Sequence, residues 1–313
     1  MIKRFLALVF ACVAGIAAAA QDPDPAKLQL ASANALVRDA VTGQPIYAKA
    51  ADEVTAIASL TKLMTAMVAL DAGQPLDELI SVGIDDFDYL KGTRSRLGLG
   101  TQLPRREMLR LALMSSENRA ASAVARHYPG GLPAFVAAMN AKAVSLGLAR
   151  TRFADPTGLS PRNVSTANDL ATMVTAAAQY PLIREYSTTP SAFVEVDSTG
   201  RIVGFNNSNR LVASGSWEIL LQKTGYIREA GRCLVMLANV ASKPVVIVLL
   251  DSVGKFTRLG DAERVKHWLE TGSALPLKAA IRAAVPRGAT SAPARSAAAP
   301  VRGSFKSTAS RSR

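Results

Sequence analysis

The most informative part of this 313-residue sequence is Ser59–Leu70, which reads SLTKLMTAMVAL. A helix places Lys62, three residues after Ser59, on the same face as the serine. The stretch is apolar nearly all round, so this face is expected to be buried. Burying a lysine is unfavourable unless its amine becomes neutral or finds partners. A neutral or partner-held amine beside a serine hydroxyl is able to activate that serine as a nucleophile without a histidine.

Two further motifs follow this serine–lysine pair along the chain. Residues 116–118 read SEN after a helical segment, and residues 223–225 read KTG at the start of a strand-like run. The two histidines, His127 and His267, neighbour no nucleophile motif. The order and separation of the motifs match the set Ser-x-x-Lys, Ser-x-Asn and Lys-Thr-Gly of penicillin-binding proteins and serine β-lactamases.

The sequence around the motifs is distinctive as well. Residues 57–66 read IASLTKLMTA, residues 114–121 read MSSENRAA and residues 155–159 read DPTGL. These stretches resemble the D-alanyl-D-alanine peptidases of low molecular mass, which are penicillin-binding proteins. Residues 222–226, QKTGY, and residues 231–234, GRCL, resemble more narrowly the D-alanyl-D-alanine endopeptidase branch, the penicillin-binding protein 7 type. The similarity covers about Gln29–Thr271.

Strand-like segments lie at both ends of the central region. A hairpin is expected from Ala33–Val37 and Ile46–Ala48, and two buried strands from Cys233–Val240 and Val245–Leu250. This arrangement suggests one antiparallel sheet assembled from N- and C-terminal segments. The family resemblance implies an α+β fold, in which a five-stranded antiparallel sheet is covered by helices and faces a mostly helical lobe. The site of that family lies in the cleft between them.

Helices are expected between and after these strands. A helical region is predicted over Leu103–Ala143, broken around Ser115 and near Pro129. Thr166, followed three residues later by an aspartate, makes a capping box that opens a helix over Ala167–Gln179. A last helix is predicted at 261–270.

The resemblance assigns catalytic roles to three residues. Ser59 is the expected nucleophile, which attacks the carbonyl carbon of a penultimate D-alanine. Lys62 is the expected base, and its pKa should be lowered by burial and by the second cation, Lys223. Ser116 would bridge Lys62 and the leaving amine and return the proton as the amine departs.

Five residues are expected to bind substrate. Asn118 offers a donor and an acceptor, one for a substrate amide and one for the catalytic lysine. Lys223 and Thr224 would hold the substrate carboxylate, and Gly225 would leave the strand edge free for a substrate that adds as a strand. By family analogy, the oxyanion hole uses the backbone N–H groups of Tyr226 and the nucleophile.

Each of these residues has a structural alternative. Lys223 could be a solvated lysine on a sheet edge, and Asn118 a cap for the helix that follows. Asp155 is interpreted as a backbone brace in a turn rather than as an acid. Glu117 is expected to face away from its two motif neighbours, since successive side chains of an extended stretch point in opposite directions.

The two ends of the chain differ from its body. Residues 1–20 read as a secretory signal peptide, with a charged start, an apolar core and a small-residue cleavage site. Residues 276–313 are rich in Ala, Pro and Ser and contain eight lysines and arginines but no acid, so a disordered basic tail is expected. Without these two segments, 27 lysines and arginines face 24 acids, so the overall charge of +13 belongs mostly to the tail. Anionic membrane lipid or wall polymer are its expected partners, and a solvated tail without a partner is the alternative.

Together with the signal-like start, the resemblance therefore implies a periplasmic serine peptidase at 21–275 that cleaves D-alanyl cross-links of peptidoglycan through an acyl-enzyme and is inhibited by β-lactams. No metal, cofactor or nucleic acid is expected. A D-Ala-D-Ala carboxypeptidase with the same site is the first alternative. A serine β-lactamase is disfavoured because no Glu-x-x-Leu-Asn segment lies between Asn118 and Lys223. A non-catalytic wall-binding protein would have no need of Lys62.

Overall fold

The computed structural model describes residues 23–197 and 199–276. The predicted signal peptide at 1–20 and, apart from Pro276, the predicted basic tail lie outside the described residues. Within those two described ranges, no helix combines the length and the apolar character that crossing a bilayer requires.

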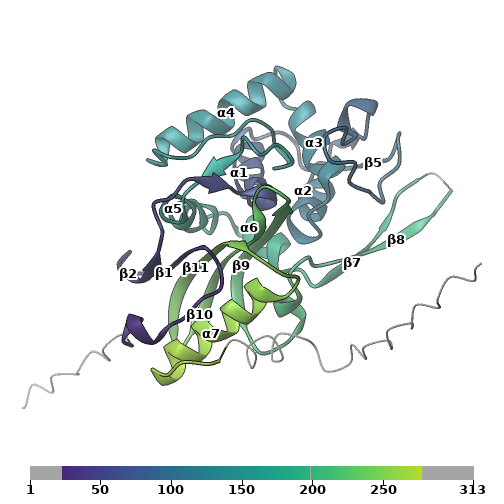
Figure 1. Cartoon of the computed structure of the whole chain (residues 1–313). Coiled ribbons are helices and arrows are strands. Elements are labelled where there is room, and N and C mark those ends of the chain that lie inside the picture. Colours follow the sequence, from purple (N-terminus) through teal and green to yellow (C-terminus); the bar gives the residue numbers. More distant parts are fainter. Residues whose placement is uncertain (1–22, 198, 277–313) are drawn as a thin grey trace, which may run out of the picture.

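The central element is a five-stranded antiparallel sheet with the order β2-β1-β11-β10-β9 (Figure 1). Its strands are β1 (Asn34–Asp39), β2 (Pro45–Lys49), β9 (Glu218–Ile227), β10 (Gly231–Val240) and β11 (Lys243–Ser252). Leu36 on β1 lies opposite Val248 on β11, so the N-terminal hairpin joins the C-terminal strands. The predicted sheet is confirmed, and β9 forms one of its edges.

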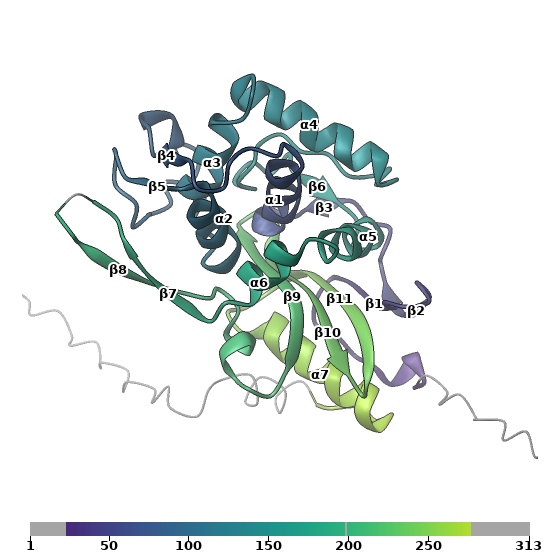
Figure 2. The ribbon, with the colours of Figure 1, turned by 180° about the vertical axis from the view of Figure 1, so that it is seen from behind.

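Helices cover both faces of this sheet (Figure 2). The helices of the described residues are α1 (Lys62–Asp71), α2 (Arg105–Met114), α3 (Asn118–Arg126), α4 (Gly131–Ser145), α5 (Ala167–Ala177), α6 (Pro181–Thr188) and α7 (Thr257–Thr271). Of these, α5 and α7 pack against opposite faces of the sheet, whereas α3 and α4 pack against α1. Side chains of β11 alternate between the faces: Ile247 is buried in the same core as Trp268 of α7, and Val248 in the same core as Leu170 of α5. The sheet is therefore the middle layer of the molecule.

The predicted helices are present with shifted ends. The region predicted at 103–143 consists of α2, α3 and α4, interrupted at the two expected places. Thr166 caps α5 by accepting a hydrogen bond from the backbone N–H of Asp169 at 3.0 Å. Neither α6 nor the first turn of α7 was predicted.

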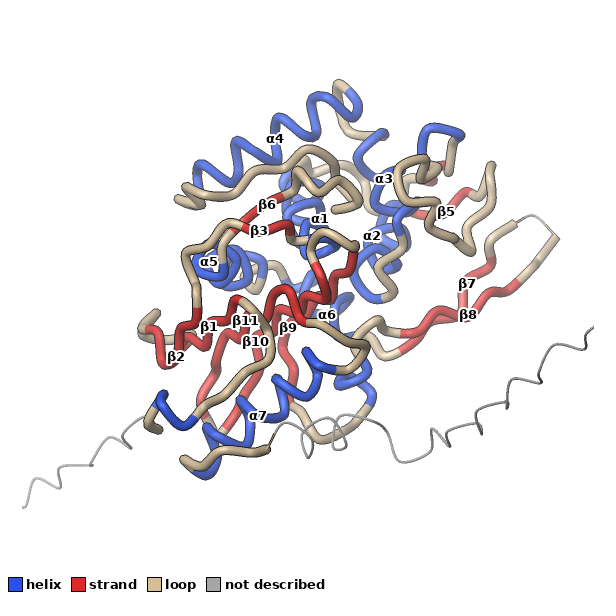
Figure 3. The backbone as a smooth tube through the Cα atoms, in the orientation of Figure 1, coloured by secondary structure: helices blue, strands red, loops and turns tan. Residues whose placement is uncertain are grey.

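Short elements complete the fold. They are β3 (Thr55–Ala56) with β6 (Val164–Ser165), β4 (Leu79–Ser81) with β5 (Gln102–Pro104), β7 (Ser191–Glu195) with β8 (Ile202–Asn206), and the 3-10 turns η1 (Pro25–Lys27), η2 (Ala58–Thr61), η3 (Ile84–Asp86) and η4 (Arg210–Ala213). The β7–β8 hairpin projects from the body of the molecule (Figure 3). Its pairing was not predicted from the sequence.

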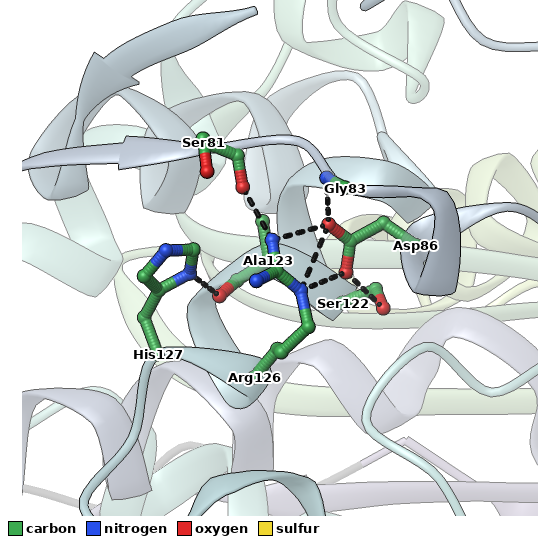
Figure 4. A network of polar contacts seen from close by, with 7 residues as sticks. All are labelled: Ser81, Gly83, Asp86, Ser122, Ala123, Arg126 and His127. Atoms are coloured by element: carbon green, nitrogen blue, oxygen red, sulfur yellow. Dashed lines mark hydrogen bonds and ion pairs between the residues drawn. The ribbon is translucent and has the colours of Figure 1, made fainter. Parts of the chain in front are cut away.

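A buried carboxylate fixes η3 against α3 in the helical lobe (Figure 4). Asp86 accepts hydrogen bonds from the backbone N–H of Gly83 at 2.7 Å and from Ser122 at 2.8 Å, and it pairs with Arg126 at 2.9 Å. Arg126 also donates to the carbonyl of Ser81 at 2.6 Å. This network anchors the start of the loop that follows η3, which reaches the site described next.

Candidate active site

Ser59 lies in a short 3-10 turn rather than in a regular helix. The turn η2 contains Ser59, and α1 begins only at Lys62. Ala58 has a φ of 48°, a left-handed conformation that is unfavourable for a residue with a side chain. The prediction that one helix carries both groups is wrong in this detail, yet the turn still brings the Lys62 amine within 3.0 Å of the Ser59 hydroxyl.

Lys62 is the central group of the site, and only 1% of its surface is exposed. Its Nζ lies 3.0 Å from Ser59 Oγ, 2.7 Å from Asn118 Oδ1 and 2.6 Å from the carbonyl oxygen of Thr157. Carbonyl and amide oxygens only accept hydrogen bonds, whereas a hydroxyl donates as well. A neutral amine therefore gives its two N–H groups to the two carbonyl-type oxygens and directs its lone pair to the hydroxyl of Ser59.

Burial lowers the pKa of the Lys62 amine to about 7, although the carboxylates of Asp155 and Glu117 raise it in part. A substantial fraction of the amine is therefore neutral near pH 7. The expectation that Lys223 also lowers the pKa of Lys62 is not met, since the charges that act on Lys62 are the two carboxylates. At Lys223, burial and then the positive charge of Lys62 hold the pKa well below its usual range.

A tight turn holds the carbonyl group of Thr157 against Lys62. One oxygen of Asp155 accepts from the backbone N–H groups of Thr157 and Gly158, at 2.6 and 2.8 Å, and the other accepts from Ser160 at 2.9 Å. The interpretation of Asp155 as a backbone brace is therefore confirmed. The role of Thr157 was not predicted, because a backbone oxygen has no side-chain signal; the DPTG turn is the nearest clue in the sequence.

Two glycines allow other segments of the chain to approach the turn η2, which contains Ser59 and is called the nucleophile turn below. A Cβ atom at Gly158, whose φ is 81°, would lie 1.9 Å from the carbonyl oxygen of Ala58. A Cβ atom at Gly225 would lie 3.0 Å from the carbonyl oxygen of Ile57 and 3.1 Å from the backbone nitrogen of Ser59. The contact that Gly225 permits in this structure is thus with the nucleophile turn.

The second motif turns sharply and then enters α3. Ser116 has a φ of 63°, and Glu117 is buried and caps α3 by accepting from the backbone N–H of Arg119 at 3.3 Å. The extended stretch from which Glu117 was expected to face away from its two neighbours is interrupted by the left-handed Ser116, and the Glu117 carboxylate raises the pKa of Lys62 in part. The cap alternative for Asn118 is wrong, since Glu117 is the cap and Asn118 binds Lys62.

Ser116 makes no hydrogen bond with Lys62. The three contacts of the lysine amine go to other residues, and within residues 23–197 and 199–276 the Ser116 hydroxyl has no hydrogen-bond partner. It lines a pocket of about 250 Å³ together with Asn118, Arg94 and Arg96. The hydroxyl is therefore free to meet a group that enters this pocket.

The third motif lies on the edge strand β9. Lys223 is fully buried, so the alternative of a solvated edge lysine is wrong. Its amine donates to the carbonyl of Thr224 at 2.9 Å, and the Thr224 hydroxyl donates to Ser208 at 2.8 Å. Tyr226 is 57% exposed, with the guanidinium of Arg232 4.4 Å from its ring centre. These residues form the strand side of the site, with Tyr226 at its surface.

A serine and a buried lysine, joined by an asparagine from a helical lobe and bordered by a Lys-Thr-Gly strand edge, define a serine peptidase of the penicillin-binding class. Comparison with known proteins agrees. The model of the D-alanyl-D-alanine carboxypeptidase family matches residues 17–254, and the chain belongs to this family of serine-type D-Ala-D-Ala peptidases.

Individual relatives support the same assignment. The chain is 47% identical over 283 residues to a D-alanyl-D-alanine endopeptidase of Pseudomonas aeruginosa, covering 90% of this chain and 91% of that protein. It is 48% identical over 277 residues to a D-alanyl-D-alanine endopeptidase of Escherichia coli, covering 88% of each. The crystal structure of the DD-transpeptidase of Streptomyces K15 superposes with a TM-score of 0.70 at 30% identity, covering 75% of this chain and 95% of that one.

We expect Gly158→Ala to disrupt the nucleophile turn. The added Cβ atom would collide with the Ala58 carbonyl, so the free energy of unfolding should fall by about 3 kcal/mol or more. Gly73→Ala is the matched control, because Gly73 also has a positive φ, 62°, but has open space around it. It should lose only about 1 kcal/mol. Urea unfolding measures both, and equal losses would contradict the clash.

Proposed function

We propose that this enzyme is a DD-endopeptidase, which cleaves D-alanyl cross-links of peptidoglycan through an acyl-enzyme on Ser59 and is acylated by β-lactams. The observation that carries the chemistry is the buried Lys62 amine, 3.0 Å from the Ser59 hydroxyl, whose other partners are two acceptor oxygens. The preference for cross-links rests on the two endopeptidases with which the chain shares nearly half of its residues.

The proposed reaction begins with a proton transfer from Ser59 to Lys62. The Ser59 oxygen attacks the carbonyl carbon of the D-alanine, and the resulting oxyanion accepts hydrogen bonds from the backbone N–H groups of Ser59 and Tyr226. This assignment is supported by the close packing of the neighbouring Gly225 against the backbone nitrogen of Ser59.

The proton then passes to the leaving amine as the carbon–nitrogen bond breaks. Ser116 is the proposed carrier between Lys62 and the amine, because its hydroxyl has no competing hydrogen bond within the described residues. Asn118 would donate its second amide N–H to the substrate, since its oxygen accepts from Lys62. Water then hydrolyses the ester on Ser59 and regenerates the enzyme.

Lys223 and Thr224 are the proposed site for the substrate carboxylate. The buried Lys223 amine is held towards neutrality by burial and by the charge of Lys62, and its pKa is low. A carboxylate beside it would favour the charged form, because opposite charges at close range stabilise each other. Substrate binding and protonation of Lys223 would therefore be linked.

A D-Ala-D-Ala carboxypeptidase is the second candidate. The family model carries that description, and more distant relatives such as a carboxypeptidase of Bacillus subtilis, 30% identical over 217 residues, carry it too. Both activities would use the same residues.

We also propose that the enzyme acts in the periplasm, as the signal-like sequence at 1–20 implies. The eight cations at 276–313, with no acid among them, would hold it near anionic wall polymer or membrane lipid.

Digestion of defined muropeptides tests the proposed activity. Purified protein should cleave cross-linked dimers to monomers faster than it removes terminal D-alanine from monomeric pentapeptides, and Ser59→Ala should do neither. Mass spectrometry of the products separates the activities, and labelled penicillin should be found on the peptide that contains Ser59. Release of terminal D-alanine without cross-link cleavage would favour the carboxypeptidase, and labelling at another residue would exclude Ser59 as nucleophile.

We expect Lys62→Arg to be nearly as damaging as Lys62→Ala. Arginine keeps the charge but does not release a proton in proteins, so it is unable to act as a base. Acylation by penicillin should fall by about 10²–10⁴-fold in both variants. In the wild type, acylation should rise with pH through about 7 and then level off, because the base is the neutral form of Lys62.

Circular dichroism must show that Lys62→Arg is folded. A folded Lys62→Arg enzyme that is acylated within tenfold of the wild-type rate would contradict the lysine-base mechanism and leave Ser59 as the nucleophile.

Deleting residues 276–313 should leave muropeptide cleavage nearly unchanged and weaken retention on intact walls or anionic vesicles. Salt should have the same effect on the full chain, because exposed charges are screened. Sedimentation with walls at low and high salt measures retention. Equal retention of both forms would show that the segment binds neither partner.

A further inference from the structure

Asn118 is held from outside the known motifs by the loop that connects η3 with β5. Its Nδ2 donates to the hydroxyl oxygen of Thr93 at 3.0 Å, while its Oδ1 accepts from Lys62 at 2.7 Å. The Thr93 hydroxyl in turn donates to a carboxylate oxygen of Asp88 at 2.7 Å. Asp88, Thr93 and Asn118 thus form a chain of hydrogen bonds that ends at the amine of Lys62.

The direction of these hydrogen bonds is fixed at Asp88. Its two oxygens accept from the backbone N–H groups of Leu90, Lys91 and Thr93, each at 2.9 Å, and from the Thr93 hydroxyl. Burial raises the pKa of Asp88, but these hydrogen bonds outweigh it and hold the pKa below its usual range. An ionised carboxylate only accepts hydrogen bonds, so the hydroxyl proton of Thr93 must point to Asp88.

The orientation of the Asn118 amide follows from this. With its proton directed to Asp88, the Thr93 oxygen presents a lone pair, which the nitrogen end of the amide satisfies and the oxygen end would repel. The oxygen end must then face Lys62. In the flipped amide, an N–H group would face the lysine Nζ and compete with Ser59 for its lone pair.

We propose that Asp88 and Thr93 are positioning residues, which fix the orientation of the Asn118 amide and thereby direct the lone pair of the Lys62 amine to Ser59. This inference rests on the proposed function, in which Lys62 is the base. It adds two residues outside the three motifs to the machinery of the same reaction.

The loop that carries Thr93 is held to α3 on both sides. Before it, Asp86 pairs with Arg126 (Figure 4). Around it, Arg119 donates to the carbonyl of Leu97 at 2.6 Å and lies 3.7 Å from the ring centre of Phe87. Since Asn118 and both arginines belong to α3, the Thr93 hydroxyl and the amide it binds are attached to the same helix. Thr93 is thus a fixed acceptor.

The same loop offers a matched control. Lys91 forms an ion pair with Glu229 at 2.6 Å, and both side chains are partly exposed. This pair ties the loop to the β9–β10 turn but makes no contact with the Asn118 amide. Lys91→Gln therefore removes a loop contact and leaves the chain of hydrogen bonds from Asp88 through Thr93 to Asn118 intact.

The test is the second-order rate of acylation by fluorescent penicillin, measured for the full chain with thermal unfolding in parallel. Thr93→Val keeps the shape but removes the hydroxyl, and we expect a loss of about tenfold, equivalent to about 1.4 kcal/mol. Thr93→Ser restores the hydroxyl and should recover most of the rate. Lys91→Gln should stay within about twofold of wild type.

Asp88→Asn is the second arm. The carboxylate of Asp88 accepts hydrogen bonds from its neighbours, whereas an asparagine amide would direct an N–H group towards some of these donors. A loss of acylation rate similar to that of Thr93→Val is therefore expected. If Asp88 and Thr93 both act through Asn118, the double variant Asp88→Asn/Thr93→Val should be acylated no more slowly than the slower of the two single variants. Losses that multiply, or a Thr93→Ser enzyme as slow as Thr93→Val, would contradict the proposal.

Two outcomes separate this inference from the proposed function. Wild-type protein that is not labelled by penicillin would overturn both. Labelled wild type together with Thr93→Val at an unchanged rate would overturn the positioning role alone.

Discussion

The removal of the Lys62 amine from water is the constraint on which the site depends. A charged amine is unfavourable in a buried environment, and this burial lowers its pKa to about 7. Two acceptor oxygens then determine which way the neutral amine faces. Burial thus favours the neutral amine that the proposed mechanism needs, and the geometry of its acceptors directs the lone pair of that amine to the hydroxyl of Ser59.

The placement of nearby acids supports this interpretation. Asp155 and Glu117 both act on Lys62 through space, but neither accepts a hydrogen bond from it. Their oxygens are engaged by backbone N–H groups, those of a turn for Asp155 and that of Arg119 for Glu117. A carboxylate in direct contact would hold the lysine in its charged form and leave no lone pair for the proposed proton transfer. Asp155 therefore braces the turn that carries the Thr157 oxygen, and Glu117 caps the helix that begins at Asn118, while neither acid cancels the effect of burial on the pKa of Lys62.

Local patterns predicted the strands at both ends of the chain and the three motifs, and the family resemblance supplied the five-stranded architecture of the sheet. Apolar strands at both ends, helix caps and the serine–lysine spacing are all readable from neighbouring residues. The carbonyl of Thr157 and the hydroxyl of Thr93 were not predicted, because they reach the site through contacts with residues distant in sequence. The conformation of Ser116 was missed for a related reason. A left-handed serine is not indicated by residue type, and it removes the extended backbone on which the inferred direction of Glu117 rested.

The nucleophile itself is positioned by the sheet and a turn more than by the helix that follows it. Ala58 is left-handed, and such a conformation persists only where the surroundings over-determine it. Those surroundings are Gly158 of the turn, where a Cβ atom would collide with the Ala58 carbonyl, and Gly225 of β9, where a Cβ atom would make a tight contact with the backbone of Ile57 and Ser59. The turn that touches Ala58 also delivers the Thr157 carbonyl to Lys62. One local packing arrangement therefore sets both the position of Ser59 and the direction of the Lys62 amine, so that residues far from each other in the chain meet at the hydroxyl from which the proposed mechanism takes its proton.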